Sequence, residues 1–302
     1  MKHDPDFLIV EYAVNDGDGT GTYAYCHEAI IREALENDCA VMQLFMTANS
    51  YGYECGQKTH GPTGEHYGIP QVSTKDALYG REYVRSDGQT FVFWDENNPS
   101  KSILADGTHP NDTGYAMTAT LINHSLNAIY ENLNNITTKV APIPEAKYDL
   151  APLMQENEII DPATHKNNSR VEIVSLGGFA KNSTADSYRS NIKAMYGVNA
   201  TSTNIEPMVI KVNNCHAFIA ISETNQLGLY AKVEAYDAQT GKLLSTDTSK
   251  VNTQYSRKSI RTHHASFESI EGQDVVFKIT PYVSSNTPSG ANACILRSFA
   301  IA

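Results

Sequence analysis

The sequence has no long hydrophobic run and no cluster of cysteines. No apolar stretch approaches the roughly 18 residues that a membrane-spanning helix needs, so we expect no membrane span. The first residues, Met1–Asp6, lack the apolar core of a signal peptide. The 5 cysteines show no C-x-x-C spacing, which argues against both a disulfide framework and a structural zinc site.

Positive charge is also scarce. The chain carries 23 Lys and Arg against 34 Asp and Glu, a net charge of −11, and no basic cluster interrupts this balance. Binding to a phosphate backbone depends on such clusters. We therefore expect no nucleic-acid partner, and a neutral or cationic small substrate fits the charge better.

The pattern of apolar residues predicts an α/β domain at the amino-terminal end. Two nearly continuous apolar runs, 7–14 and 40–46, are typical of buried parallel strands. Between them, residues 22–35 carry apolar side chains at helical spacing. Strand, helix and strand in this order favour a right-handed crossover in a parallel sheet. The sequence further predicts a long loop over 49–68, a strand over 69–72, and helices over 75–83 and 111–133.

The period of the pattern changes in the second half. Prolines and asparagines indicate a linker over 137–152, between a partial α/β domain over 1–136 and a second domain over 153–302. Short β-branched and aromatic runs then predict strands over 171–176, 207–212, 217–222, 229–236, 275–283 and 294–301, with a hairpin turn at Thr240-Gly241. The predicted fold is an α/β, incomplete doubly wound parallel sheet followed by an all-β sandwich.

The most informative segment is Asp106–Asn111, which reads Asp-Gly-Thr-His-Pro-Asn. Asp106 and His109 stand three apart just ahead of a predicted helix, so they can share one turn. The carboxylate would then hold the imidazole, fix its tautomer and stabilise the imidazolium that forms on proton uptake. Such a pair can act as a general base with its orienting group, although an Asp-x-x-His alone is more often part of a solvated loop.

Two blocks of the sequence resemble the SGNH (GDSL-type) serine ester hydrolase family. Residues 106–114, Asp-Gly-Thr-His-Pro-Asn-Asp-Thr-Gly, resemble the block that supplies the Asp and His of that family's triad. Residues 10–16, which end in Asn15-Asp16, resemble the block in which an Asn side chain donates to the oxyanion. The segment 66–70, His-Tyr-Gly-Ile-Pro, and Trp94 also look like the family.

The resemblance implies a role for each matching residue. His109 would be the general base and then the general acid, Asp106 its orienting group, and Asn15 an oxyanion-hole donor. The alternative for Asn15 is a turn residue after a strand, a position that Asn often fills. Ala13 stands where the family usually has Gly, which bears on local backbone approach and not on Asn15 itself.

The family's nucleophile block has no counterpart, because the chain contains neither Gly-Asp-Ser nor a Gly-x-Ser-x-Gly elbow. Ser50, Ser73 and Ser102 lie in the same domain, but none follows a strand in the required context, and we interpret each as a loop serine. We expect the first strand to present an open, apolar edge. Either the gene model is truncated or self-association or a complementing segment fills the gap. The chain as given should be close to inert.

The resemblance implies acyl transfer from an ester to a serine and then to water. Carbohydrate O-deacetylation is our preferred hypothesis, because an appended β-sandwich often accompanies work on polysaccharides, while a lipid or thioester substrate stays open. The rival hypothesis is a glycan-binding β-sandwich attached to a remnant hydrolase domain, and a third is a purely structural sandwich.

We expect no cofactor and no metal, with His60 and His66 a weaker metal-site alternative. An extracellular or cell-surface location is favoured over the cytoplasm.

Overall fold

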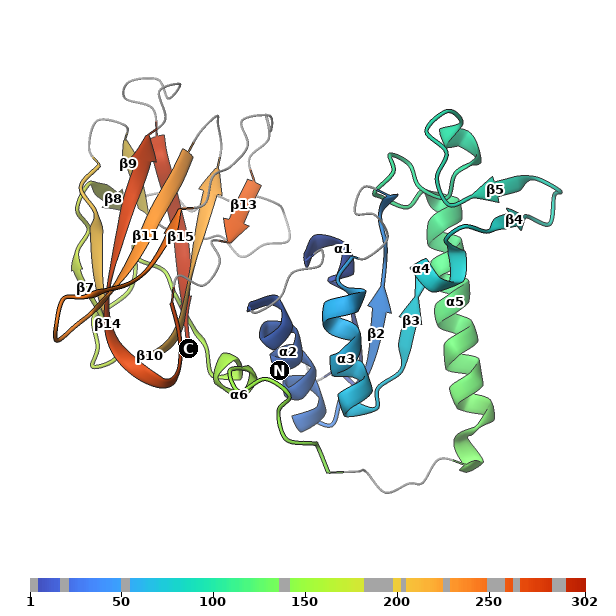
Figure 1. Cartoon of the computed structure of the whole chain (residues 1–302), viewed down its shortest axis with the longest axis horizontal. Coiled ribbons are helices and arrows are strands. Elements are labelled where there is room, and N and C mark those ends of the chain that lie inside the picture. The colour runs from blue at the N-terminus through green and yellow to red at the C-terminus, as the bar shows by residue number, and fades with distance from the viewer. Residues whose placement is uncertain are drawn as a thin grey trace. The chain divides into compact units, whose positions relative to one another are not determined.

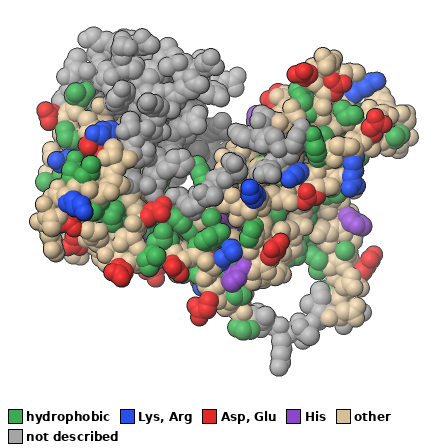
Figure 2. All heavy atoms as spheres, in the orientation of Figure 1, with side chains coloured by type: hydrophobic (Ala, Val, Ile, Leu, Met, Phe, Trp, Pro, Cys, Tyr) green, Lys and Arg blue, Asp and Glu red, His purple; other side chains and the backbone are tan. Residues whose placement is uncertain are grey.

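The computed structural model describes residues 5–16, 22–49, 55–135, 142–181, 198–201, 205–224, 229–248, 259–262, 267–283 and 292–302. The chain divides into two compact units, Met1–Gln155 and Glu156–Ala302 (Figure 1). Within the described ranges, no helix combines the length and apolar character that crossing a membrane would require. On the face drawn in Figure 2, Lys and Arg side chains are scattered among Asp and Glu.

The first unit is built on a parallel sheet with the order β1-β2-β3. β1 (Phe7–Val10) pairs with β2 (Ala40–Phe45), and β2 pairs with β3 (Gln71–Ser73). Helix α2 (Thr22–Glu36) connects β1 to β2. The predicted α/β class and its strand–helix–strand unit are therefore confirmed.

Helices cover the two faces of this sheet unequally. Val41 of β2 packs in a cluster with Ile31 of α2, on the face that α2 shares with α3 (Gln57–Tyr67). Met42 and Leu44 lie on the other face and pack against α5 (Asp112–Glu131). This alternation follows from the period of two along a strand.

Two expectations for the first strand need correction. β1 ends at Val10, and a short helix, α1 (Ala13–Asp16), follows in place of the predicted strand residues. The strand is also not buried on both faces, because Phe7 is 41% and Ile9 39% exposed. The cause is the limited reach of α5, whose contacts with the sheet, among the described residues, are with β2 and β3. The predicted apolar edge is thus visible in the described part of the chain, where β1 pairs with β2 alone.

The predicted loop over 49–68 is wrong, because its second half forms α3. Gly61, Pro62 and Gly64 lie inside this helix and give it a weak helical signal. Tertiary contacts compensate for that weakness: the Gln43 amide donates to the carbonyl of His60 (2.9 Å), and Gln71 donates to the carbonyl of Gly61 (2.8 Å). Both partners come from the sheet, so the helix depends on the strands beside it.

The region between β3 and α5 is also shorter in helix than predicted. Ser73 caps α4 (Thr74–Leu78) by accepting from the amide of Asp76, and the helix ends before a two-stranded hairpin. This hairpin, which the sequence did not predict, consists of β4 (Glu82–Val84) and β5 (Thr90–Val92). A short 3-10 turn, η2 (Pro99–Lys101), lies between the hairpin and α5, and another, η3 (Leu133–Asn135), follows α5.

The described part of the predicted linker packs on the first unit. Glu28 of α2 is fully buried, and it accepts from the amides of Lys147 (2.6 Å) and Tyr148 (2.8 Å) and from the Tyr67 hydroxyl (2.6 Å). Arg32 donates to the carbonyl of Pro144 (3.0 Å). The unit then closes with α6 (Ala151–Gln155). Residues 137–141 lie outside the described ranges.

The second unit is an antiparallel β-sandwich, as predicted from its sequence pattern. Its strands are β6 (Glu158–Ile160), β7 (Val171–Ser175), β8 (Phe179–Lys181), β9 (Val198–Thr201), β10 (Met208–Thr224), β11 (Leu229–Asp237), β12 (Leu243–Thr248), β13 (Ser259–Thr262), β14 (Phe267–Val283) and β15 (Asn292–Ile301). Phe218, Phe277 and Phe299 stack at its core. The turn at Gly241, with φ of 69°, joins β11 to β12 as predicted.

Two predicted strands, 207–212 and 217–222, are one strand, β10. The pairing of β10 with β14 shifts register on both sides of Cys215, and Asn214 adopts a positive φ of 49°. These are the features of a bulge, in which extra residues leave the ladder while the strand continues. The polar residues between the two apolar runs therefore indicated a bulge and not a turn.

The glycines of α3 offer a matched test of its packing. A Cβ at position 64 would lie 1.8 Å from Gln43 Oε1, whereas a Cβ at position 61 would meet only Gln71 Oε1, at 3.8 Å. We expect Gly64→Ala to destabilise the first unit, and Gly61→Ala to stabilise it by up to about 1 kcal/mol through helix propensity. Urea unfolding followed by the fluorescence of Trp94, the single tryptophan, checks this. Equal midpoints for the two variants would contradict the packing described.

Candidate active site

Asp106 and His109 form a hydrogen-bonded pair. His109 Nδ1 lies 2.9 Å from Asp106 Oδ2 and 3.1 Å from Oδ1, so the predicted contact is confirmed. A carboxylate only accepts, and Nδ1 therefore carries the proton that it donates. Nε2 is then the ring nitrogen able to accept a proton from a neighbouring hydroxyl. Both side chains are exposed, His109 by 73% and Asp106 by 58%.

Backbone amides hold the carboxylate of this pair in place. Asp106 Oδ1 accepts from the amides of His109 (2.8 Å) and Thr108 (3.1 Å). These bonds, first the one from the His109 amide and then the one from its ring, lower the pKa of Asp106 to about 2. The group is thus a carboxylate at any ordinary pH, which is the form that orients an imidazole.

The loop that carries the pair has its backbone fixed at several points. The Ala105 amide donates to the carbonyl of His109 (2.7 Å), and the Asn49 amide, just after β2, donates to the carbonyl of Gly107 (2.7 Å). Gly107 has a φ of 79°, and a Cβ there would lie 3.2 Å from the Trp94 ring. Both the backbone angle and the tryptophan therefore favour glycine at this position.

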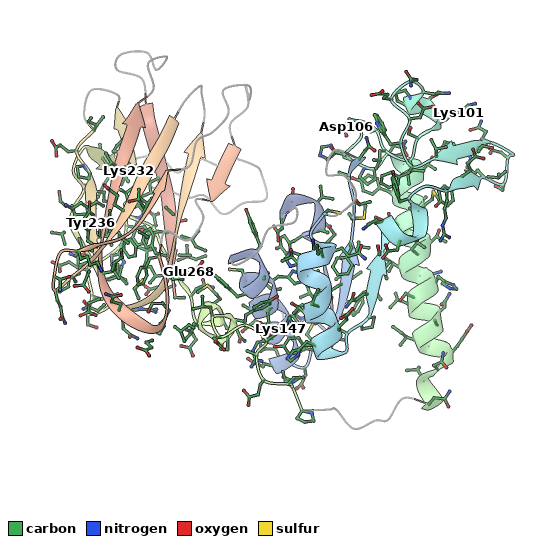
Figure 3. All side chains as sticks on the ribbon, viewed as in Figure 1. Lys101, Asp106, Lys147, Lys232, Tyr236 and Glu268 are labelled. Atoms are coloured by element: carbon green, nitrogen blue, oxygen red, sulfur yellow. The ribbon has the colours of Figure 1, made fainter. Side chains whose placement is uncertain are left out.

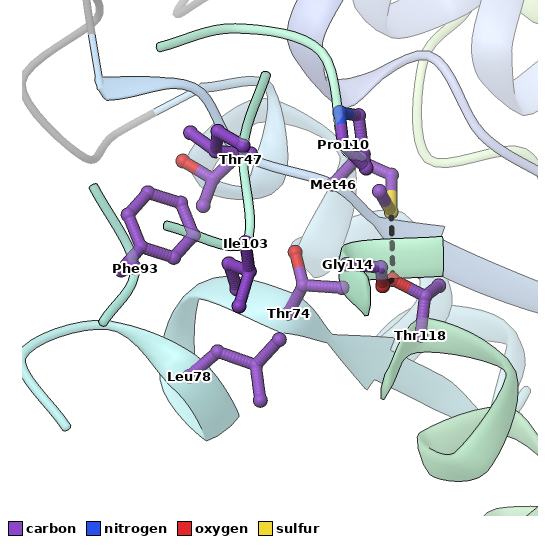
Figure 4. Close-up of a pocket in the computed structure, with 10 residues that line it drawn as sticks. Met46, Thr47, Thr74, Leu78, Phe93, Ile103, Pro110, Gly114 and Thr118 are labelled. Atoms are coloured by element: carbon purple, nitrogen blue, oxygen red, sulfur yellow. Dashed lines mark hydrogen bonds between the residues drawn. The ribbon is translucent and has the colours of Figure 1, made fainter. Parts of the chain in front are cut away.

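The residues beneath the loop are closely packed (Figure 4). A Cβ at Gly114 would lie 2.2 Å from the carbonyl oxygen of Ile103, so the first turn of α5 approaches that backbone directly. Thr118 contacts Met46 and donates to the carbonyl of Gly114 (2.9 Å). The cavity among these residues measures about 10 Å³, which leaves no room for a substrate. A ligand of the pair therefore does not fit among these residues.

Asn15 lies on α1, and its side chain is exposed. The helix is fixed at Ala13, whose amide donates to the Glu11 carboxylate (3.0 Å) and whose carbonyl accepts from the amide of Gly56 (2.6 Å). α1 and the loop of Asp106 both lie beyond the carboxyl ends of the strands (Figures 1 and 3). Open α/β sheets bind ligands at that edge. The part that Asn15 plays there stays a prediction.

A buried pair of histidines next to Asn15 was not predicted. His60 Nε2 lies 2.9 Å from Asp16 Oδ2, and the His60 ring stacks on His27 at 3.9 Å between centroids. Gln43 of β2 completes the cluster, with its amide 2.8 Å from His27 Nε2. The one sequence signal for this cluster was the Asn15-Asp16 pair. It was not enough to predict the cluster, because His27 and His60 lie on α2 and α3, far from Asp16 in the chain. The cluster ties α1 to the core of the unit.

The remaining sequence candidates that the structure describes have structural partners. Ser73 caps α4, and Ser102 is fully buried and accepts from the amide of Asp95 (2.8 Å), while Ser50 lies outside the described residues. His66 contacts the carbonyl of Glu145 and does not meet His60. In the part of the chain that the structure describes, no three His, Cys, Asp or Glu side chains gather as metal ligands would.

An α/β unit followed by a β-sandwich is also the architecture of a solved esterase. The chain has the fold of "a two-domain esterase (CEX) active on acetylated mannans", with a TM-score of 0.66 and 17% identity. The match covers 99% of this chain and 73% of that chain. A structure of such an esterase co-crystallised with mannopentaose matches with a TM-score of 0.65 and 18% identity, over 99% and 72% of the two chains.

Sequence comparison adds nothing to this structural likeness. The chain matches no protein-family model and no curated protein. A family 35 carbohydrate-binding module from an environmental isolate matches at a TM-score of 0.26 and 10% identity, over 44% of this chain and 91% of that chain. That score is too low to support an inference. The comparisons therefore show a shared two-domain fold.

The titration of Asp106 can be measured directly. We expect its carboxyl to titrate near pH 2 in ¹³C NMR spectra, because backbone and imidazole bonds favour the charged form. In His109→Ala the midpoint should rise but stay below the ordinary value of 3.8, since the amides of residues 108 and 109 still donate. An unchanged midpoint in this variant would mean that the ring contributes nothing to the pair.

The buried His27 should make stability depend on pH. Burial, and then the neighbouring His60, lower its pKa from 6.5 to about 3, so the unfolded chain takes up this proton first. Stability is therefore complete above pH 6.5 and decreases as the pH falls toward 3, with a loss on the order of 2 kcal/mol at pH 5. Urea unfolding followed by Trp94 fluorescence should show a shallower pH dependence in His27→Gln. His66→Gln, at an exposed histidine, is the control, and parallel curves for both variants would refute this assignment.

Proposed function

We propose that the first unit supplies the base, its orienting group and an oxyanion donor for acyl-ester hydrolysis by the chemistry of the SGNH family, and that it acts only together with a segment that brings the nucleophile. The observation that carries the proposal is the contact between His109 Nδ1 and Asp106, in a loop beyond the carboxyl ends of the strands, where open α/β sheets bind ligands. It leaves Nε2 as the general base, with its tautomer fixed by the carboxylate. The fold shared with an esterase active on acetylated mannans supports the same chemistry.

The reaction has two steps. A serine hydroxyl transfers its proton to His109 Nε2 while its oxygen attacks the ester carbonyl, and Asn15 donates to the oxyanion that forms. His109 then gives the proton to the departing alkoxide, which leaves an acyl-serine. In the second step water attacks this ester with the same base, and the acid and the free serine are released. Asp106 stays ionised throughout and stabilises the imidazolium.

The nucleophile is the one part that His109, Asp106 and Asn15 do not supply. We propose that a polypeptide segment with a Gly-Asp-Ser strand pairs with the outer edge of β1, which in the described part of the chain pairs with β2 alone. A parallel strand there would end beside α1 and Asn15. The segment would also cover Phe7 and Ile9, which are exposed on the face of β1 that α5 does not reach.

The surface of α5 supports the same placement. Met117 packs with Phe91 on one flank of this helix, toward the hairpin. Tyr115, Leu126 and Tyr130 are exposed on roughly the opposite flank, given about 100° per residue. We infer that this flank lies on the side of β1, because Ile122 and Ile129, which pack on the sheet, lie between it and the flank that meets the hairpin. Exposed apolar surfaces on neighbouring elements are typical of a contact that the molecule makes with another segment.

An O-acetylated neutral polysaccharide is the substrate class that we propose. The esterase with the shared fold acts on acetylated mannans, and the net charge of −11 disfavours an anionic polymer. Hydrolysis of such a polymer fits an extracellular or cell-surface location.

Activity measurements test this proposal. The purified chain should hydrolyse p-nitrophenyl acetate no faster than buffer, because an imidazole activates a hydroxyl only when one is held beside it. Addition of a Gly-Asp-Ser segment, as an upstream extension or as a separate polypeptide, should restore hydrolysis. His109→Ala in the restored enzyme should abolish it, while His124→Ala, an exposed histidine of α5, serves as the matched control.

Two outcomes would contradict the proposal in different ways. Turnover by the unextended chain that His109→Ala removes would place the nucleophile among the serines dismissed above. Failure of every complemented chain to hydrolyse the ester, with the Asp106–His109 contact intact by NMR, would favour the rival hypothesis of a glycan-binding protein with a remnant hydrolase unit.

A further inference from the structure

The β4–β5 hairpin and the first turns of α5 line an open pocket of about 550 Å³. We call it the hairpin groove. Its apolar lining includes Tyr83 and Phe91 from the hairpin and Met117 from the helix. Glu82 and Asp112 are exposed residues at its border. The volume lies within the range of roughly 300–1,000 Å³ that is usual for small-ligand sites.

The hairpin groove is held open by contacts on the inner side of the hairpin. Phe91 is buried and packs in one cluster with Met117, Leu121 and Phe93, which anchors the hairpin to α5. In the described part of the chain, β4 and β5 form a separate two-stranded sheet, and β5 bridges to Ser102 at its base. The hairpin stands beside the upper half of α5 in Figure 1. The groove is therefore formed before any ligand arrives.

The position of the hairpin groove links it to the candidate active site. α5 begins at Asp112, three residues after His109. Three residues span at most about 11 Å of chain, so the two sites are neighbours. A polymer is long enough to occupy both sites at once, whereas a small ester is not.

The lining favours one class of ligand. Glu82 and Asp112 contribute two carboxylates, whereas the one cation, Arg85, pairs with Asp87 and lies 5.1 Å from the Phe91 ring centre. An anionic ligand would meet net repulsion. Carboxylates accept from hydroxyl groups, and aromatic side chains pack against apolar C–H faces, a combination that suits a pyranose ring. A simple acyl chain would use the apolar lining but leave the polar border unused.

We propose that the hairpin groove is a subsite for neutral sugar units of a polysaccharide. Its link to an ester at His109 rests on the proposed function, but the binding of sugar does not. Binding to the hairpin groove can therefore be tested on the full chain without any hydrolysis.

The test is an NMR titration of the ¹⁵N-labelled full chain with mannopentaose. We expect amide shifts at residues 82–92 and 112–120. Ala116→Trp, which places a large ring in the hairpin groove, should weaken binding at these residues by at least about tenfold. Ala128→Trp is the matched control, because it adds the same ring at an exposed alanine of the same helix outside the groove.

The alternative outcomes are distinct. Shifts confined to residues 156–302, or none at all, would overturn the subsite. So would shifts at the hairpin groove caused by octanoate and not by mannopentaose, because they would assign an acyl-chain site. Groove shifts in a chain that never gains esterase activity would retain the subsite and reject the proposed hydrolysis.

Discussion

The approach of α5 to the backbone of Ile103 is the constraint on which the rest of the first unit depends. Gly114 permits it, because any side chain there would meet the Ile103 carbonyl. Asn111 fixes the same junction twice, since its side chain accepts from the Gly114 amide and donates to the carbonyl of Ser102. The Asp106–His109 loop lies directly before this junction and the hairpin groove directly after it. One packing contact thus sets the relative position of both sites.

The buried polar cluster has a different physical character. Gln43 lies in the middle of a strand whose neighbours are apolar, and with His27 and His60 it brings polar atoms into the core. Burial of such groups costs free energy unless they find partners. His60 has a partner in Asp16, next to Asn15. The contact between His60 and Asp16 therefore holds the segment that carries Asn15, the proposed oxyanion donor, against the buried cluster.

Sequence reasoning predicted the features that depend on local spacing. The Asp106–His109 contact needs only one turn of chain, α2 carries a helical apolar period, and β2 is a nearly continuous apolar run. α3 was missed because its glycines and proline read as loop, and only contacts from Gln43 and Gln71 reveal why it is helical. The His27–His60 stack was missed for the same reason, since its two rings come from separate helices. What depends on long-range packing could not be derived from spacing.

Glu28 has a consequence for how the two units can be separated or exchanged. Its buried carboxylate binds the amides of Lys147 and Tyr148, so these residues belong to the α/β unit although their sequence resembles a tether. A cut placed at the prolines would leave a buried anion without its donors, a defect that typically costs several kcal/mol. Chimeras that graft another sandwich onto this unit therefore need their junction after Gln155, where the first compact unit ends.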